Sequence, residues 1–378
     1  MILLVLLLLW GWTGFPLELE LELGWAGRPV LGAVNPLWVT LRNPGPTAVQ
    51  GELRLALEFG SPWRGRGTYT ALVPCAVGPG GRTRLLLPWP VPAGSFLLRA
   101  ALRAGERELA EGELAFGAEP EPLRAGIGPP LEPLDLHLAP TELPADPLLL
   151  SPFAELRVFT PLGGWEGDVV GAWRAFFGGG VRVEAEALRA HLAGLRPPAP
   201  AWALLLPGLF LYLLGAAWAL PRLAQGRPVL PLALALGFLV LAGFYSVFRE
   251  AAPHRGTIQI VVEQPSLTSF GLELLGVAPW RREELVLEGW WYELLPPRGW
   301  EGRDLLWRFT EAGWQTVLKL EPAVPRLLLR LRREASPPGA AVARPGWLAH
   351  ALVLSWERAR VFQAQPEPGW TAYVVRLP

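Results

Sequence analysis

Hydrophobic and polar residues alternate strictly over residues 17–23, where leucines and glutamates take turns. An extended chain points successive side chains to opposite faces, so this pattern predicts a half-buried strand whose leucines face a core. Four further short apolar-rich runs, separated by turns rich in proline and glycine, are residues 37–41, 52–57, 82–87 and 95–100. Short strands at this spacing predict a β-sandwich for residues 15–118.

Residues 121–195 show a different pattern. A helical periodicity over residues 165–177 groups Val169, Val170, Trp173, Phe176 and Phe177 on one side, and the run Gly178-Gly179-Gly180 suits the end of such a helix. Apolar or alternating runs predict strands at residues 123–128, 156–160 and 181–187. This order of strands and helix predicts a small α/β unit.

The last segment, residues 256–378, again alternates like a β domain. Its predicted strands are residues 257–263, 284–288, 305–309, 316–320, 326–331 and 372–376. Their short lengths and regular spacing predict a mainly-β domain.

Two long uncharged runs separate these segments. One lies between Arg196 and Arg222, and the other between Arg227 and Arg249. A helix needs about 20 apolar residues to cross a bilayer. The runs therefore predict a transmembrane α-hairpin with helices at 199–221 and 228–248 and a loop at 222–227. The fold class is thus predicted as a multidomain membrane protein.

The first 14 residues are apolar and resemble a signal peptide or a signal anchor. The loop with Arg222 and Arg227 contains no acid, and short cytoplasmic loops carry an excess of basic residues. Together these features predict a two-helix, multi-pass protein of the cell membrane with both large segments extracytoplasmic. The lipid bilayer is then one partner.

The charges exclude one class of partner. The chain has 34 basic and 34 acidic residues, so its net charge of zero predicts no nucleic-acid binding. Cys75 is the one cysteine, which excludes an intrachain disulfide and a metal site built on cysteines. Within its strand-like stretch it is interpreted as a small buried residue.

Residues 36–57, PLWVTLRNPGPTAVQGELRLAL, resemble the opening of immunoglobulin-like modules in bacterial envelope proteins. The stretch from Trp173 to Gly179 resembles a helix end in a degenerate class I amidotransferase-like domain of uncharacterised two-span envelope proteins. The resemblance implies these two folds for residues 15–118 and 121–195. An amidotransferase needs a nucleophilic cysteine, and residues 121–195 have none, so that activity does not carry over.

Two pairs of polar residues are candidates for a metal- or cation-binding site. Asp135 and His137 would share a strand face, as metal ligands often do, but a surface turn is the favoured interpretation. Glu184 and Glu186 would likewise share a face toward a cation or, as favoured, toward solvent. The four histidines, which are His137, His191, His254 and His350, lack the spacing of a zinc site.

The sequence therefore predicts no catalytic, cofactor-binding or metal-binding residue, no cofactor, and no enzyme. If the α/β segment were a cryptic hydrolase, Asp168, Glu184 or His191 would carry its chemistry. The leading hypothesis is a non-catalytic membrane-anchored envelope protein whose outer domains bind a protein partner or organise a complex.

The second hypothesis, ranked ahead of the cryptic hydrolase, is a cell-surface carbohydrate- or peptidoglycan-binding protein. It depends on tryptophans crowded into the last segment, because aromatic rings stack on sugars. They are Trp280, Trp290, Trp291, Trp300, Trp307 and Trp314. The alternative interpretation is that these rings fill a core.

Overall fold

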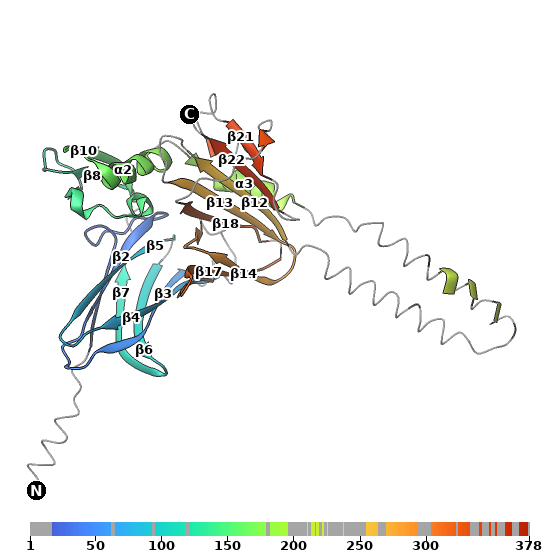
Figure 1. Ribbon diagram of the computed structural model, residues 1–378, viewed down its shortest axis with the longest axis horizontal. Coiled ribbons are helices and arrows are strands. Elements are labelled where there is room, and N and C mark those ends of the chain that lie inside the picture. The colour runs from blue at the N-terminus through green and yellow to red at the C-terminus, as the bar shows by residue number, and fades with distance from the viewer. Residues whose placement is uncertain are drawn as a thin grey trace, which may run out of the picture.

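The computed structural model describes most of the chain outside the two uncharged runs (Figure 1). The described residues are 17–61, 65–92, 95–117, 121–178, 182–195, 255–263, 270–293, 304–322, 324–332 and 370–376, with short stretches within 210–237 and 340–364. The predicted signal segment, residues 1–14, lies outside them.

The N-terminal sheet has three antiparallel strands in the order β1-β2-β5. These are β1 (Glu18–Leu23), β2 (Val34–Arg42) and β5 (Arg82–Pro90). In β1 the glutamates are exposed, Leu19 and Leu21 are partly buried and Leu23 is buried. The predicted alternating strand and its register are confirmed.

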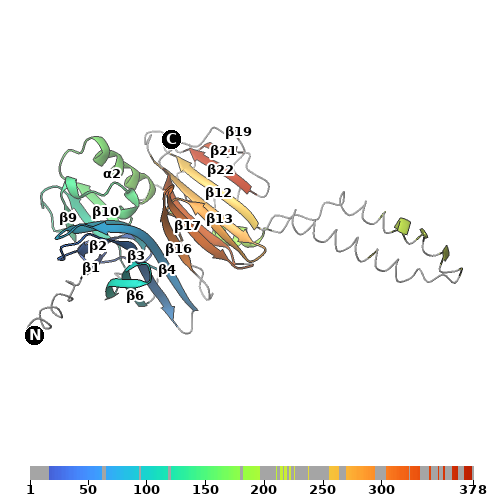
Figure 2. The same cartoon turned by 60° about the horizontal axis from the view of Figure 1, so that its bottom comes forward.

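A seven-stranded sheet, here called the shared sheet, combines the first and last segments of the chain. Its order is β14 (Glu283–Glu288), β17 (Gly313–Leu320), β16 (Leu305–Thr310), β4 (Gly65–Val77), β3 (Val49–Ser61), β6 (Ser95–Ala104) and β7 (Arg107–Phe116). β16 pairs in parallel with β4, so one hydrogen-bonded sheet runs across two regions that the sequence analysis treated separately (Figure 2).

The C-terminal sheet also has seven strands. Its order is β15 (Tyr292–Glu293), β18 (Arg326–Arg332), β13 (Gly271–Pro279), β12 (Arg255–Glu263), β22 (Trp370–Arg376), β21 (Arg360–Ala364) and β19 (Ala340–Ala341). Every residue of β13 is buried, because the sheet is covered on both faces. Helix α3 (Ala185–Ala193) covers one face, where a Cβ at Gly276 would lie 2.8 Å from Leu192.

The α/β unit contains a parallel sheet in the order β10-β8-β9. Its elements are β8 (Leu123–Ile127), β9 (Leu136–Leu138), β10 (Phe153–Val158), the 3-10 helices η1 (Pro140–Glu142) and η2 (Pro147–Leu150), and α2 (Gly164–Phe176). The helix predicted at 165–177 is confirmed. It ends where Gly178 donates to the Trp173 carbonyl at 2.8 Å, and a Cβ at Gly178 would lie 2.9 Å from the Trp173 ring.

The strand predicted at residues 181–187 is wrong. Only β11 (Arg182–Val183), which pairs with β20 (Leu352–Val353), is extended, and α3 starts at Ala185. Alanine, leucine and glutamate favour helices, and a helix buries Ala185, Leu188 and Leu192 on one side. The strand was predicted from alternation over residues 181–187 alone. The helical period becomes visible only when the residues up to Ala193 are included.

The predicted transmembrane hairpin requires a correction. No helix among the described residues is long and apolar enough to cross a membrane, and the described chain is mainly β. The fold class with helices at 199–221 and 228–248, and the two-span membrane localisation built on it, are therefore not supported. Most residues of both predicted spans lie outside the described part. The prediction rested on a lack of charge, which permits a membrane helix but does not create one.

Candidate functional site

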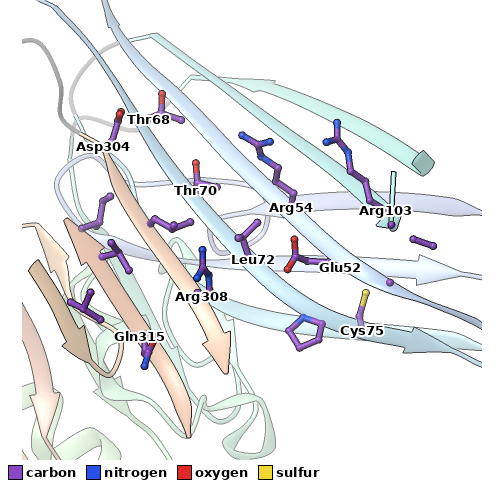
Figure 3. A pocket seen from close by; sticks show the side chains of 18 of the residues that line it. Glu52, Arg54, Thr68, Thr70, Leu72, Cys75, Arg103, Asp304, Arg308 and Gln315 are labelled. Atoms are coloured by element: carbon purple, nitrogen blue, oxygen red, sulfur yellow. The ribbon is translucent and has the colours of Figure 1, made fainter. Parts of the chain in front are cut away.

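The outer face of the shared sheet is hollowed into a groove of about 1460 Å³ (Figure 3). Side chains alternate between the two faces along each strand. In β3, Leu53 and Leu55 are buried inside, whereas Glu52 and Arg54, which alternate with them, point outward. The residues that line the groove are Gln50, Gly51, Glu52, Arg54, Thr68, Thr70, Leu72, Pro74, Cys75, Ala76, Arg103, Ala104, Gly105, Glu284, Val286, Asp304, Leu305, Leu306, Arg308, Gln315, Val317 and Lys319.

Two arginines flank a leucine in one row across the groove. The Cα of Leu72 on β4 is paired with that of Arg54 on β3 and with that of Arg308 on β16. Leu72 lies between the two arginines in Figure 3. Since neighbouring strands are about 4.8 Å apart, the two arginine Cα atoms are separated by about 10 Å.

The next row toward β14 is mainly apolar. Thr70 pairs with Leu306, Leu306 with Val317, and Val317 with Val286. Val286 is 52% exposed at the end of this row, whereas Thr70, Leu306 and Val317 are partly buried. The groove therefore presents a cationic row beside an apolar row.

Charges on the two halves of this face have different surroundings. Outside the groove, Arg99 on β6 contacts Glu113 at 2.8 Å and Glu58 at 3.0 Å. Both carboxylates raise the pKa of Arg99, the Glu113 hydrogen bond most strongly. By contrast, Arg54 and Arg308 have no ion pair with any residue in the described part of the chain.

Cys75 lies at one end of the groove and is partly buried. Burial raises the pKa of its thiol, and a hydrogen bond with the backbone of Leu53 opposes this in part. A raised pKa disfavours the thiolate, which is the reactive form of cysteine. This cysteine is therefore poorly suited to act as a nucleophile.

Asp135 and His137 are both engaged in local contacts of the α/β unit. An Asp135 carboxylate oxygen accepts from the Arg124 amide at 2.8 Å, and the Nε2 atom of His137 lies 3.0 Å from the Glu132 carbonyl oxygen. No group of three or more potential metal ligands occurs among the described residues.

The residues proposed for a cryptic hydrolase lie on two helices. Asp168 is exposed on α2, whereas Glu184 and His191 are at opposite ends of α3. Seven residues of helix rise about 10 Å, which is beyond hydrogen-bonding distance for these two side chains. Burial lowers the pKa of His191. Glu186 is exposed on the same helix and does not share a strand face with Glu184.

The described tryptophans of the last segment are used mainly in packing. Trp307 is fully buried, and its ring stacks on Trp290 with centroids 4.7 Å apart and an interplanar angle of 7°. Trp291 is also buried, and its carbonyl accepts a hydrogen bond from the Trp307 indole at 2.6 Å. These rings do not form an exposed stacking platform for sugars. Trp300 lies outside the described residues.

Sequence reasoning did not find the arginine row. Arg54 and Arg308 each stood in a predicted strand, and their outward orientation follows from alternation. Their juxtaposition depends on the parallel pairing of β4 with β16, which joins residues more than 200 positions apart. No local sequence pattern encodes that pairing.

Comparisons with known proteins do not assign the chain to a family. No family model and no curated protein matches it. The similar solved structures include the Pseudomonas fluorescens alkylpurine DNA glycosylase AlkC bound to DNA containing an abasic site analog. That match has 15% identity and a TM-score of 0.22, over 30% of this chain and 33% of the other.

Two further structural matches are equally distant. A Paenibacillus sp. cycloisomaltooligosaccharide glucanotransferase complexed with cycloisomaltoheptaose has 17% identity and a TM-score of 0.22, over 38% of this chain and 20% of the other. The solution structure of a putative late embryogenesis abundant protein has 14% identity and a TM-score of 0.19, over 29% of this chain and 75% of the other. Similarities at this level carry no functional argument.

Proposed function

We propose that this chain is a non-catalytic binding protein that receives a segment of a partner protein in the groove of the shared sheet. The observation that carries the proposal is the cationic row of Arg54 and Arg308, which has no ion pair within the described part of the chain, beside a partly exposed apolar row. Exposed charges next to apolar surface in a concave site supply both orientation and contact area for a ligand.

Within the described residues, the side chains of the groove and of α3 do not bring a nucleophile together with an acid or a base. The groove has one cysteine with a raised pKa and no histidine. Glu184 and His191 of α3 are too far apart along the helix to act as an acid–base pair.

A photo-crosslinking amino acid at Val286 tests the proposal, with Leu86 as the matched control. Both are outward-facing apolar residues of strands, 52% and 42% exposed, but Leu86 belongs to β5 of the N-terminal sheet. We expect one protein to crosslink in cells at Val286 and not at Leu86, and to bind the purified chain. Equal crosslinking at both positions, or none at Val286, would contradict the groove as the binding site.

A further inference from the structure

We infer that the groove recognises an acidic side chain and an apolar side chain that stand two positions apart in an extended segment of the partner. This inference rests on the proposed function and adds the chemistry that the partner segment must have. It is derived from the row geometry of the shared sheet and from the charges in it.

The cationic row supplies the position for the acid. Arg54 and Arg308 project from strands on either side of β4, so a carboxylate above Leu72 is within reach of both guanidinium groups. Arginine donates two parallel hydrogen bonds to a carboxylate, and such charge-assisted bonds are among the strongest in proteins. Between the two arginines the row holds only Leu72. The acids of the same row, Glu288 on β14 and Glu111 on β7, lie two strands away from Arg308 and from Arg54 respectively.

The neighbouring rows set the side on which the apolar residue lies. The row on the Glu52 side carries both charges, because Glu52 of β3 pairs in register with Arg103 of β6, so that row is less suited to an apolar side chain. On the other side lie Thr70, Leu306 and Val317, which suit an apolar side chain. The segment therefore places its acid over Leu72 and its apolar residue over Leu306.

The spacing follows from strand geometry. Rows of a sheet face are two residues apart along each strand, which is about 6.8 Å. An extended peptide lying along β4 and β16 repeats its side chains on one face at the same interval. An acid and an apolar residue two positions apart thus match the cationic row and the apolar row together.

Fluorescence anisotropy with labelled peptides tests this recognition. The probe is Gly-Ser-Glu-Thr-Leu-Thr-Gly-Ser, and its controls replace the glutamate by glutamine or move it next to the leucine. We expect the probe to bind the full chain at least tenfold more tightly than either control. Arg54→Gln and Arg308→Gln should each weaken probe binding about tenfold, the equivalent of about 1.4 kcal/mol.

Arg99→Gln is the matched control variant, because Arg99 is exposed on the same sheet but already paired with Glu58 and Glu113. The affinity of the Arg99→Gln variant for the probe should stay within twofold of that of the unchanged protein.

Equal binding of the probe and the glutamine peptide overturns the inference, as does displacement of the probe by inorganic phosphate at an equal concentration. If crosslinking at Val286 persists in either case, the proposed function stands while the acidic motif fails. Absence of that crosslink removes the proposed function itself.

Discussion

The inner face of the shared sheet packs against two different surfaces, and the chemistry of the two contacts differs. Toward the N-terminal sheet the contact is apolar. Leu53, Leu55 and Leu57 of β3 and Leu37 and Val39 of β2 are all fully buried in one cluster. Burial of apolar surface is favourable in many side-chain arrangements. This contact therefore tolerates the replacement of one apolar side chain by another of similar volume.

Toward the C-terminal sheet the contact includes buried charges. Arg326 binds both carboxylate oxygens of Glu293, at 2.6 and 3.1 Å, and the two side chains are 4% and 0% exposed. Arg330 binds buried Glu273 at 2.6 Å, and its guanidinium lies 4.4 Å from the Trp291 ring centroid. Arg326 and Arg330 are four residues apart in β18, so their side chains lie on the same face of that strand.

The charged contacts also connect the two sheets. Arg330 donates to the Glu288 carbonyl of β14 at 2.6 Å, and Arg326 donates to the Lys319 carbonyl of β17 at 3.4 Å. A buried ion pair is compensated only when its geometry is correct. The apolar contact is therefore compatible with several side-chain arrangements, whereas the charged contacts are satisfied by one placement of the C-terminal sheet on the shared sheet.

Trp307 lies at the junction of the two halves. Its ring is 5.5 Å from Trp89 of the N-terminal sheet, 5.6 Å from Tyr69 of β4 and 4.7 Å from Trp290. A single aromatic residue of β16 thus packs against both regions. We expect the two halves to unfold together because they share this sheet and this cluster.

The largest effect is expected from Arg326→Ala, which leaves Glu293 buried without its cation. The free energy of unfolding should fall by about 3–5 kcal/mol, measured by chemical denaturation. Replacing both residues by leucine should recover most of that loss, because no lone charge then remains. A double variant as unstable as the single one would contradict this reading. The exposed pair Arg282–Glu321 gives the control: Arg282→Ala should change stability by less than about 1 kcal/mol.

A smaller loss is expected from Leu55→Ala in the apolar half. Removing a fully buried leucine side chain should cost about 2–5 kcal/mol, with the value set by how far the site collapses. Calorimetry should show one transition that both Leu55→Ala and Arg326→Ala move to lower temperature. Two separate transitions, each moved by one variant alone, would show that the halves unfold independently.

The smallest effect concerns alkaline pH. Burial raises the pKa of Tyr292 far above its ordinary value, and the charge of Asp146 adds to the increase. The folded state therefore keeps this proton at a pH at which the unfolded chain loses it. Stability must fall as pH rises above about 10, by about 1.4 kcal/mol per pH unit for this one group. Below that pH the group contributes no pH dependence.

Tyr292→Phe should remove that part of the slope. Urea denaturation of both proteins between pH 9 and 11 measures the difference. Parallel pH profiles would mean that the Tyr292 hydroxyl ionises in the folded protein as readily as in the unfolded chain.

Several individual strands of this protein could be predicted from the local alternation of polar and apolar residues. Residues 17–23, 257–263 and 316–320 each showed the alternation that β1, β12 and β17 require. β13 was not predicted from the sequence. Both of its faces are buried, so polar and apolar residues do not alternate along it. The helix at α3 was mistaken for a strand because only a few residues of its longer period were considered.

The predicted hairpin failed for a related reason. The hydropathy of residues 199–221 and 228–248 shows that each run is apolar enough to lie in a bilayer as a helix. It contains no information on the rest of the fold. Asp135 and His137 were considered as metal ligands, but a surface turn was the favoured interpretation. In the structure His137 lies in β9, and Asp135 accepts a hydrogen bond from the Arg124 amide just before that strand.

Local patterns in the sequence predicted the mainly-β character, the inward and outward faces of most strands, and the helix α2. These properties depend on neighbours a few residues apart, because side-chain direction in a strand or helix follows a fixed local period. Only the tertiary structure decided that β16 lies beside β4, that Arg326 meets Glu293, and that Arg54 and Arg308 flank Leu72. Those contacts join distant parts of the chain, and their energy depends on the completed packing of whole sheets rather than on any local run of residues.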